Sequence, residues 1–187
     1  MLVPDYEVVL KEIEDQAEEK NWPIIGREKG KVLIDVCQEH NPSRVLELGA
    51  LVGYSSTMIA ANLEQKGRVV SIEINPENAE LSRINQVRAG VADQCQVVVG
   101  DALDVIPTLD GPFDMVFIDA VKEDYLRYLQ LAEPKMAANA AVVADNVLKF
   151  ADDVKPYLDY VRNSGKYESS YHEFGDDAVE VSIRRPG

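Results

Sequence analysis

Hydrophobic residues near the start of the chain repeat with the spacing of a helix. Between residues 6 and 20 one stripe consists of Tyr6, Val9, Leu10, Ile13 and Ala17. The positions between them are mostly acidic, which predicts an amphipathic helix with a solvated acidic face. After a turn at residues 22–26, a second helical pattern over residues 29–39 places Val32, Leu33 and Val36 on its apolar face.

Beyond residue 40 the pattern changes to short, almost entirely apolar runs separated by segments of helical length. The runs cover residues 44–48, 68–73, 96–99, 113–118 and 140–144. Strands that are buried on both faces have this composition. One helix start is explicit, because Asn75 can cap a helix whose first position is Pro76. The alternation predicts a doubly wound parallel sheet.

The last two runs differ, because residues 166–174 and 178–184 follow one another across the tight connection Gly175-Asp176-Asp177. They predict an antiparallel hairpin. We therefore expect an α/β fold, with a doubly wound, mostly parallel seven-stranded sheet that ends in an antiparallel C-terminal hairpin. With 187 residues, 46% of them hydrophobic, and no internal repeat or linker, the sequence predicts a single domain over residues 1–187.

The formal net charge of −14, without clustered Lys or Arg, makes nucleic acid an improbable partner and favours a small neutral or cationic ligand. No apolar run approaches the roughly 20 residues of a membrane helix, so we expect a cytoplasmic protein without a membrane partner. A homodimer is compatible with the sequence. Cys37 and Cys95 are expected to be buried free thiols, and His40 and His172 to be surface residues.

The stretch VLELGALVGYSS at residues 45–56 leads from a predicted strand through two glycines to a helix start. Such a turn lets a backbone approach a nucleotide-like ligand closely. The spacing Gly49-x-x-x-Gly53 is neither that of a dinucleotide-binding fold nor that of a phosphate-binding loop, so a phosphate group is not the expected ligand of this turn. Glu73 follows Gly49 at close to the roughly 20-residue offset of a ribose-binding acid. The ligand is therefore expected to carry a ribose.

Polar residues end all five predicted parallel strands, where ligands bind in open α/β sheets. These strand ends are Glu47, Glu73, Gly100-Asp101, Asp119 and Asp145-Asn146. Any one such acid is more often a helix cap or a solvated residue, but five together favour a binding site. If the fourth and fifth strands are neighbours, two carboxylates and an amide oxygen come close together. Oxygen ligands of this kind suit Mg²⁺ or another hard divalent cation.

Lys122 lies three residues beyond Asp119, at an expected helix start. Most lysines are simply solvated, and that remains the ordinary interpretation. Its position beside the predicted cation site favours a role as a general base.

At these residues the sequence resembles the class I S-adenosylmethionine-dependent methyltransferases, and within them the metal-dependent catechol O-methyltransferases. The similar segments are GREKGK at 26–31, LELGALVGYSS at 46–56, IEINPE at 72–77, FDMVFIDAVKEDY at 113–125 and ADNVL at 144–148. The resemblance implies S-adenosylmethionine as cofactor and Mg²⁺, or another hard divalent cation, as metal. It implies methyl transfer to a hydroxyl of a small aromatic vicinal diol.

The resemblance also implies roles for individual residues. The implied cofactor contacts are Glu47, Gly49, Gly53, Tyr54, Ser55, Glu73, Ile74, Gly100, Asp101, Ala102 and Asp119. The implied metal ligands are Asp119, Asp145 and Asn146, and Lys122 is the implied catalytic base. The implied substrate contacts are Trp22, Lys122, Asn146, Phe150 and Glu173.

Three positions depart from the catechol pattern. Val121 replaces an aromatic residue before the lysine, the family's proline near Phe150 is missing, and Glu173 in a short loop is a poor substitute for the family's substrate-binding glutamate. A metal-dependent O-methyltransferase for caffeoyl thioesters or for tRNA hydroxyuridine is the alternative. The sequence lacks the glycine spacing of a dehydrogenase and the Asn-Pro-Pro-aromatic motif of a nucleic-acid base methyltransferase. A non-catalytic scaffold protein is the alternative from a different class, but a scaffold has no need of such a set of polar residues.

Overall fold

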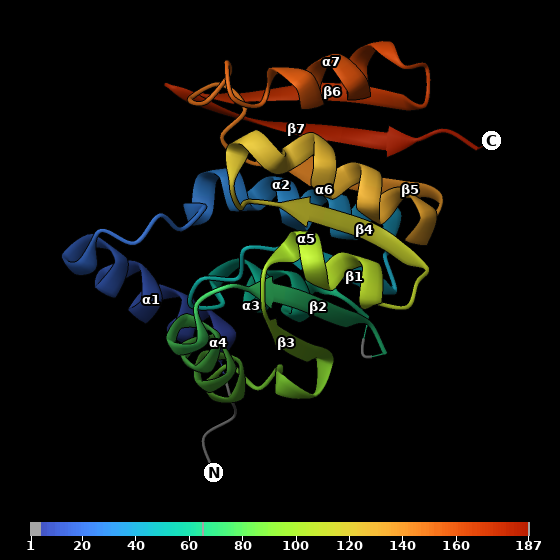
Figure 1. Cartoon of the computed structure of the whole chain (residues 1–187). Helices are drawn as coiled ribbons and strands as arrows, with labels where there is room; N and C mark the ends of the chain where they lie inside the picture. Colours follow the sequence, from blue (N-terminus) through green and yellow to red (C-terminus); the bar gives the residue numbers. More distant parts are fainter. Residues whose placement is uncertain (1–4, 65, 187) are drawn as a thin grey trace.

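The structure is a computed structural model that describes residues 5–64 and 66–186 (Figure 1). Its α-helices are α1 (Tyr6–Lys20), α2 (Gly26–His40), α3 (Tyr54–Asn62), α4 (Pro76–Arg88), α5 (Ala102–Val105), α6 (Tyr125–Ala132) and α7 (Lys155–Asn163). Short 3₁₀ turns cover η1 (Ala92–Gln94), η2 (Ile106–Thr108), η3 (Lys122–Asp124) and η4 (Glu133–Lys135). The strands are β1 (Arg44–Leu48), β2 (Arg68–Glu73), β3 (Cys95–Val99), β4 (Phe113–Ile118), β5 (Met136–Ala144), β6 (Tyr167–Phe174) and β7 (Asp177–Arg184).

The strands form one seven-stranded sheet in the order β3-β2-β1-β4-β5-β7-β6. The strands β1 to β5 pair in parallel, and β7 pairs antiparallel with both β5 and β6. The predicted doubly wound sheet with an antiparallel C-terminal hairpin is therefore confirmed. The chain places β2 and β3 on one side of β1 and then returns to place β4 and β5 on its other side. The switch point, where ligands bind in such folds, therefore lies between β1 and β4.

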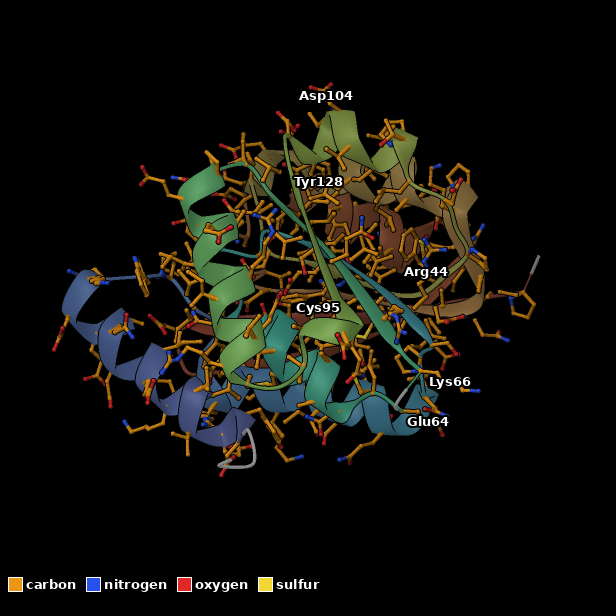
Figure 2. All side chains as sticks on the ribbon, turned by 90° about the horizontal axis from the view of Figure 1, so that it is seen from below. Arg44, Glu64, Lys66, Cys95, Asp104 and Tyr128 are labelled. Carbon is orange, nitrogen blue, oxygen red and sulfur yellow. The ribbon has the colours of Figure 1, made fainter. Side chains whose placement is uncertain are left out.

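Helices cover both faces of the sheet, with α2 and α3 behind it and α5 and α6 in front of it in Figure 1. The view from below shows the same sheet between two helical layers (Figure 2). Successive residues of β4 alternate between the two faces. Val116 and Ile118 pack in the core beneath α6 and α7, whereas Met115 and Phe117 pack in the core beneath α2 and α3. This double burial explains the continuous apolar runs of the central strands.

The predicted helix cap at Asn75 is confirmed, because its side chain accepts hydrogen bonds from the backbone of Glu77 at 2.8 Å and of Asn78 at 3.3 Å. The starts of β3, β6 and β7 each differ by one residue from the prediction and lie at Cys95, Tyr167 and Asp177, and two other boundaries need a larger correction. The second helix begins at Gly26 instead of residue 29, and β5 begins at Met136 instead of residue 140. The early part of β5 contains Asn139 at φ 63° and a register shift against β4. The hydrophobic pattern of this part of the sequence therefore does not predict a regular strand.

The two cysteines of the chain are free thiols, as predicted. Cys37 is buried and Cys95 on β3 is half-buried, so only the first fulfils the prediction of burial. Burial raises the pKa of each thiol to about 12, which leaves them unreactive near neutral pH. Across residues 5–64 and 66–186, every helix is too short or too polar to span a bilayer.

Candidate active site

A cavity of about 880 Å³ opens at the carboxyl ends of the parallel strands. In Figure 1, β4 points toward the side of the molecule where the connection from α1 to α2 passes, and Pro23, Ile24 and Ile25 of this connection line the cavity. The ends of β1, β4 and β5 are held together by backbone hydrogen bonds from Asp119 to Leu48 and from Asp145 to Ile118. These bonds bring the predicted polar strand ends to one edge of the sheet.

Gly49 and Gly53 have different structural tasks. Gly49 adopts φ 92°, and a Cβ atom there would lie 2.1 Å from the carbonyl oxygen of Asp119, so only glycine lets the ends of β1 and β4 meet. Gly53 adopts φ 83° before α3, and a Cβ atom there would lie 2.5 Å from Oγ of Ser82 on α4. Gly49 lines the cavity, whereas Gly53 packs α3 against α4 outside the lining.

Glu73 fastens the glycine turn to the end of β2. Its Oε2 accepts a hydrogen bond from the backbone of Leu51 at 2.7 Å, and its Oε1 accepts one from the backbone of Asn75 at 2.9 Å. Leu51 adopts φ 47°, a conformation that costs free energy for a residue with a branched side chain. Glu73 therefore stabilises the turn while its carboxylate lines the cavity together with Ile74.

Glu47 is completely buried behind this wall. The hydroxyl of Ser55, which does line the cavity, donates to its Oε1, and its Oε2 has no protein partner among the described residues. Burial raises the pKa of Glu47 to about 7, while hydrogen bonds from serines oppose that shift. Glu47 thus reaches the cavity through Ser55. The remaining predicted cofactor residues, Tyr54, Gly100, Asp101 and Ala102, all lie in the lining.

Lys122 lies between Asp119 and Tyr125 at the end of β4. Its Nζ donates to Oδ1 of Asp119 and to Oη of Tyr125, both at 2.8 Å. Tyr125 in turn donates to the backbone carbonyl of Asp145 at 3.1 Å. Burial and the negative charges of Asp119 and Asp145 raise the pKa of Tyr125 well above its ordinary value, so its phenol stays protonated. A continuous chain of hydrogen bonds therefore joins the ends of β4 and β5.

A second cationic group neutralises the end of β5. Nζ of Lys29 lies 2.6 Å and 2.9 Å from the two carboxylate oxygens of Asp145 and 2.8 Å from Oδ2 of Asp177. Burial and the charge of Asp119 raise the pKa of Asp145, and Lys29 opposes them. Burial alone would also raise the pKa of Asp177, but hydrogen bonds from Lys29, Asn146 and the backbone lower it to about 2. Both carboxylates can therefore stay ionised at neutral pH.

The residues predicted to contact a substrate fall into two groups. Phe150 lines the cavity, and its ring centre is 5.6 Å from Nζ of Lys122. Val121, at the position where the family has an aromatic residue, lines the cavity as well and is 54% exposed. Trp22 and Glu173 do not line it; Pro23, Ile24 and Phe174 do so at these places. The substrate roles of Trp22 and Glu173 remain predictions.

Three residues of the site were not given a role by the sequence: Lys29, Tyr125 and Asp177. A signal for Lys29 was present, because it shares the helical stripe of Val32, Leu33 and Val36 and so faces inward. A lysine on a buried face must be paired with a carboxylate. Tyr125 and Asp177 carry no comparable signal, since their partners are set by long-range packing.

The polar groups at the ends of β4 and β5 fit a hard divalent cation. Asp119 and Asp145 supply carboxylate oxygens and Asn146 supplies an amide oxygen, a donor set typical of Mg²⁺ sites that keep several waters. The ammonium groups of Lys122 and Lys29 show that these carboxylates already balance positive charge. Within the described part of the chain, no cluster of three or more His, Cys, Asp or Glu side chains has metal-binding geometry, so the set rests on two carboxylates and the amide.

Comparison with known proteins agrees with this geometry. Residues 3–166 match the O-methyltransferase family. The chain is 45% identical over 126 residues to catechol O-methyltransferase of Mycobacterium tuberculosis; the match covers 67% of this chain and 57% of that protein. It is 36% identical over 177 residues to catechol O-methyltransferase of Sus scrofa, covering 87% of this chain and 94% of that protein.

A solved structure gives the same result. The O-methyltransferase TomG from Streptomyces achromogenes, in complex with S-adenosylmethionine, has a TM-score of 0.87 and 28% identity and covers 95% of this chain and 90% of its own. The fold and its strand-end cavity define a class I S-adenosylmethionine-dependent methyltransferase. Within that class, the chain belongs to the O-methyltransferase family and is similar to the catechol O-methyltransferases.

Proposed function

We propose that this protein transfers a methyl group from S-adenosylmethionine to a hydroxyl of a small catechol-type substrate, with Mg²⁺ as the metal. One observation carries the proposal. A single cavity brings together the glycine turn, the Glu73 carboxylate, the oxygens of Asp119, Asp145 and Asn146, and the amine of Lys122. Catechol O-methyltransferases are among the relatives, which supports a vicinal diol as substrate.

The two halves of the cavity suit the two reactants. Gly49, Leu51 and Glu73 form a wall without cationic side chains, which fits a sulfonium cofactor that has a ribose and no phosphate. The Glu73 carboxylate can accept hydrogen bonds from both ribose hydroxyls in addition to its two backbone donors. Phe150 and Val121 supply apolar surface on the side of Lys122, where an aromatic ring would bind.

A divalent cation held by Asp119, Asp145 and Asn146 would lower the pKa of a bound catechol hydroxyl. Asp119 would then lie between this cation and the amine of Lys122, its neighbour at 2.8 Å. Lys122 would then accept the hydroxyl proton at Nζ as a general base, and Tyr125 keeps that nitrogen in place. The substrate oxygen would form the new C–O bond as the C–S bond breaks, leaving a neutral thioether. Orientation of the two reacting atoms can supply about 7–11 kcal/mol of the barrier reduction.

Caffeoyl thioesters and tRNA hydroxyuridine are the alternative substrates. The net charge of −14 works against tRNA, because tRNA binding needs positive charge along the phosphate backbone. A methyl-transfer assay should compare a simple catechol, a caffeoyl thioester and tRNA, each with Mg²⁺ and with a chelator. We expect methylated catechol only with Mg²⁺. Methylation of tRNA alone, or of none of the three, would reject the proposed substrate class.

A further inference from the structure

Asp177 is the first residue of β7 and follows a turn of only two residues in the C-terminal hairpin. Its side chain is turned inward to the end of β5, and the residue is 7% exposed. It accepts hydrogen bonds from the side chains of Asn146 at 2.6 Å and Lys29 at 2.8 Å and from the backbone of Lys149 at 3.2 Å and Ala178 at 2.8 Å. Four donors from three segments of the chain therefore converge on this one carboxylate.

The bond to Asn146 determines which way that amide points. An ionised carboxylate only accepts hydrogen bonds, so the group that faces Asp177 must be Nδ2 and not Oδ1. Since the amide is planar, fixing Nδ2 also fixes Oδ1 on its other branch. The backbone of Asn146 is held as well, at φ 60°, a conformation that asparagine tolerates better than most residues. Both the backbone and the side chain of Asn146 are thus constrained.

Lys29 extends the same arrangement to Asp145. Its ammonium bridges the carboxylates of Asp145 and Asp177, and only 15% of the Lys29 side chain is exposed. Without Asp177, Lys29 would lose one of its two anionic partners, and Asn146 would be free to rotate its amide. One residue of the hairpin therefore reaches two of the three groups in the candidate cation site.

From this geometry we propose that Asp177 is a positioning residue of the metal site, which orients the amide of Asn146 so that its oxygen binds the cation. This proposal rests on the proposed metal-dependent function, since it concerns a ligand of the same site. Partners that orient the direct ligands of a metal typically contribute 10- to 100-fold to its affinity. The C-terminal hairpin then has a functional task besides completing the sheet.

The test is Mn²⁺ binding to the whole protein, measured by electron paramagnetic resonance, with Asp177→Asn and Asp153→Asn compared. Asp153 is exposed and outside the cavity, so its variant makes the same change in charge without the contacts. We expect Asp177→Asn to weaken Mn²⁺ binding about 10- to 100-fold. We expect Asp153→Asn to bind as the unchanged protein does, and S-adenosylmethionine affinity in calorimetry to be equal in all three.

Different outcomes separate the two proposals. One outcome is that the unchanged protein binds Mn²⁺, and that Asp177→Asn binds it equally well but melts at a lower temperature. In that case Asp177 only stabilises the hairpin, and the inference is wrong. If the unchanged protein binds no Mn²⁺, the proposed metal-dependent function fails and the inference fails with it. Should Asp177→Asn not fold, the side-chain amide protons of Asn146 in the unchanged protein decide by nuclear magnetic resonance. A downfield, slowly exchanging proton is expected, and two freely exchanging protons would overturn the inference.

Discussion

Nζ of Lys122 and Oδ1 of Asp119 form an ion pair at 2.8 Å at the end of β4, with only 15% and 17% of their side chains exposed. The pair joins the proposed general base directly to a proposed cation ligand. Because η3 starts at Lys122, three residues after Asp119, the local chain geometry sets their separation. Proton removal and metal binding are therefore expected to be coupled at this point of the site.

Replacing the amine should test its role as the base. We expect Lys122→Ala to lower kcat by roughly 10² to 10⁴, the usual contribution of a general base, with little change in S-adenosylmethionine affinity. Lys155→Ala is the control, since Lys155 pairs with Asp159 on the surface of α7. Steady-state kinetics and calorimetry measure the two quantities. A near-normal rate for Lys122→Ala would mean that a water molecule takes the proton instead.

Glu73 should determine cofactor affinity. Its carboxylate lines the cavity and also holds the turn through Leu51, so Glu73→Ala removes both a ribose acceptor and the support of the turn. Charged hydrogen bonds contribute about 1.5–3 kcal/mol each, so calorimetry should show binding of S-adenosylmethionine weakened by roughly 10-fold or more. Glu77→Ala, an exposed change on the first turn of α4, should bind normally. Unchanged affinity in Glu73→Ala would exclude Glu73 from the ribose site.

Removal of the metal should stop methyl transfer. We expect a chelator to abolish product formation and added Mg²⁺ to restore it, because the Asp119 and Asp145 carboxylates cannot by themselves acidify a substrate hydroxyl. Asp145→Ala should be inactive with or without Mg²⁺. Product is quantified by mass spectrometry. Full activity of chelator-treated protein would contradict the proposed metal dependence.

The strand ends explain how much of this site the sequence could predict. Continuous apolar runs located β1, β2 and β4 to the residue, because strands buried on both faces leave little ambiguity about their ends. Asp119 follows the predicted end of β4, and Asp145 follows the predicted end of β5 at Ala144. The start of β5 could not be located, since Asn139 and the register shift break its pattern.

Contacts between distant segments were beyond the sequence pattern. Asp177 meets Lys29 and Asn146 only because β7 inserts between β5 and β6, and the hairpin alone does not predict that order. A hairpin added at the sheet edge in the order β5-β6-β7 would have placed Asp177 elsewhere. Side-chain packing likewise decides that Trp22 lies outside the cavity while its neighbour Pro23 lines it.

The buried carboxyl of Glu47 should make stability depend on pH. Folding raises its pKa from 4.5 to about 7, so the folded state holds a proton that the unfolded state releases. The contribution of Glu47 to the free energy of unfolding therefore falls as pH rises from about 4.5 to 7, by up to about 3 kcal/mol, and stays low above that range. Glu47→Gln keeps an acceptor for Ser55 without the charge.

Urea unfolding of the cofactor-free protein between pH 4.5 and 8 measures this effect. We expect the stability of Glu47→Gln relative to the unchanged protein to increase with pH across the window. A difference that does not depend on pH would mean that Glu47 keeps an ordinary pKa in the fold.

The position of Glu173 leads to a prediction about regiochemistry. Glu173 is exposed and does not line the cavity, so we expect that it does not hold the second hydroxyl of a catechol tightly. Val121, which precedes Lys122, lines the cavity with a small aliphatic side chain and is 54% exposed. The ring can then bind in two flipped poses, each of which presents a different oxygen for methylation.

An asymmetric catechol should therefore give a mixture of meta and para products, resolved by chromatography. Val121→Trp should shift the mixture toward one isomer, because a larger wall admits one pose more easily than the other. A single isomer from the unchanged protein would show that another lining residue, such as Phe150, already fixes the pose.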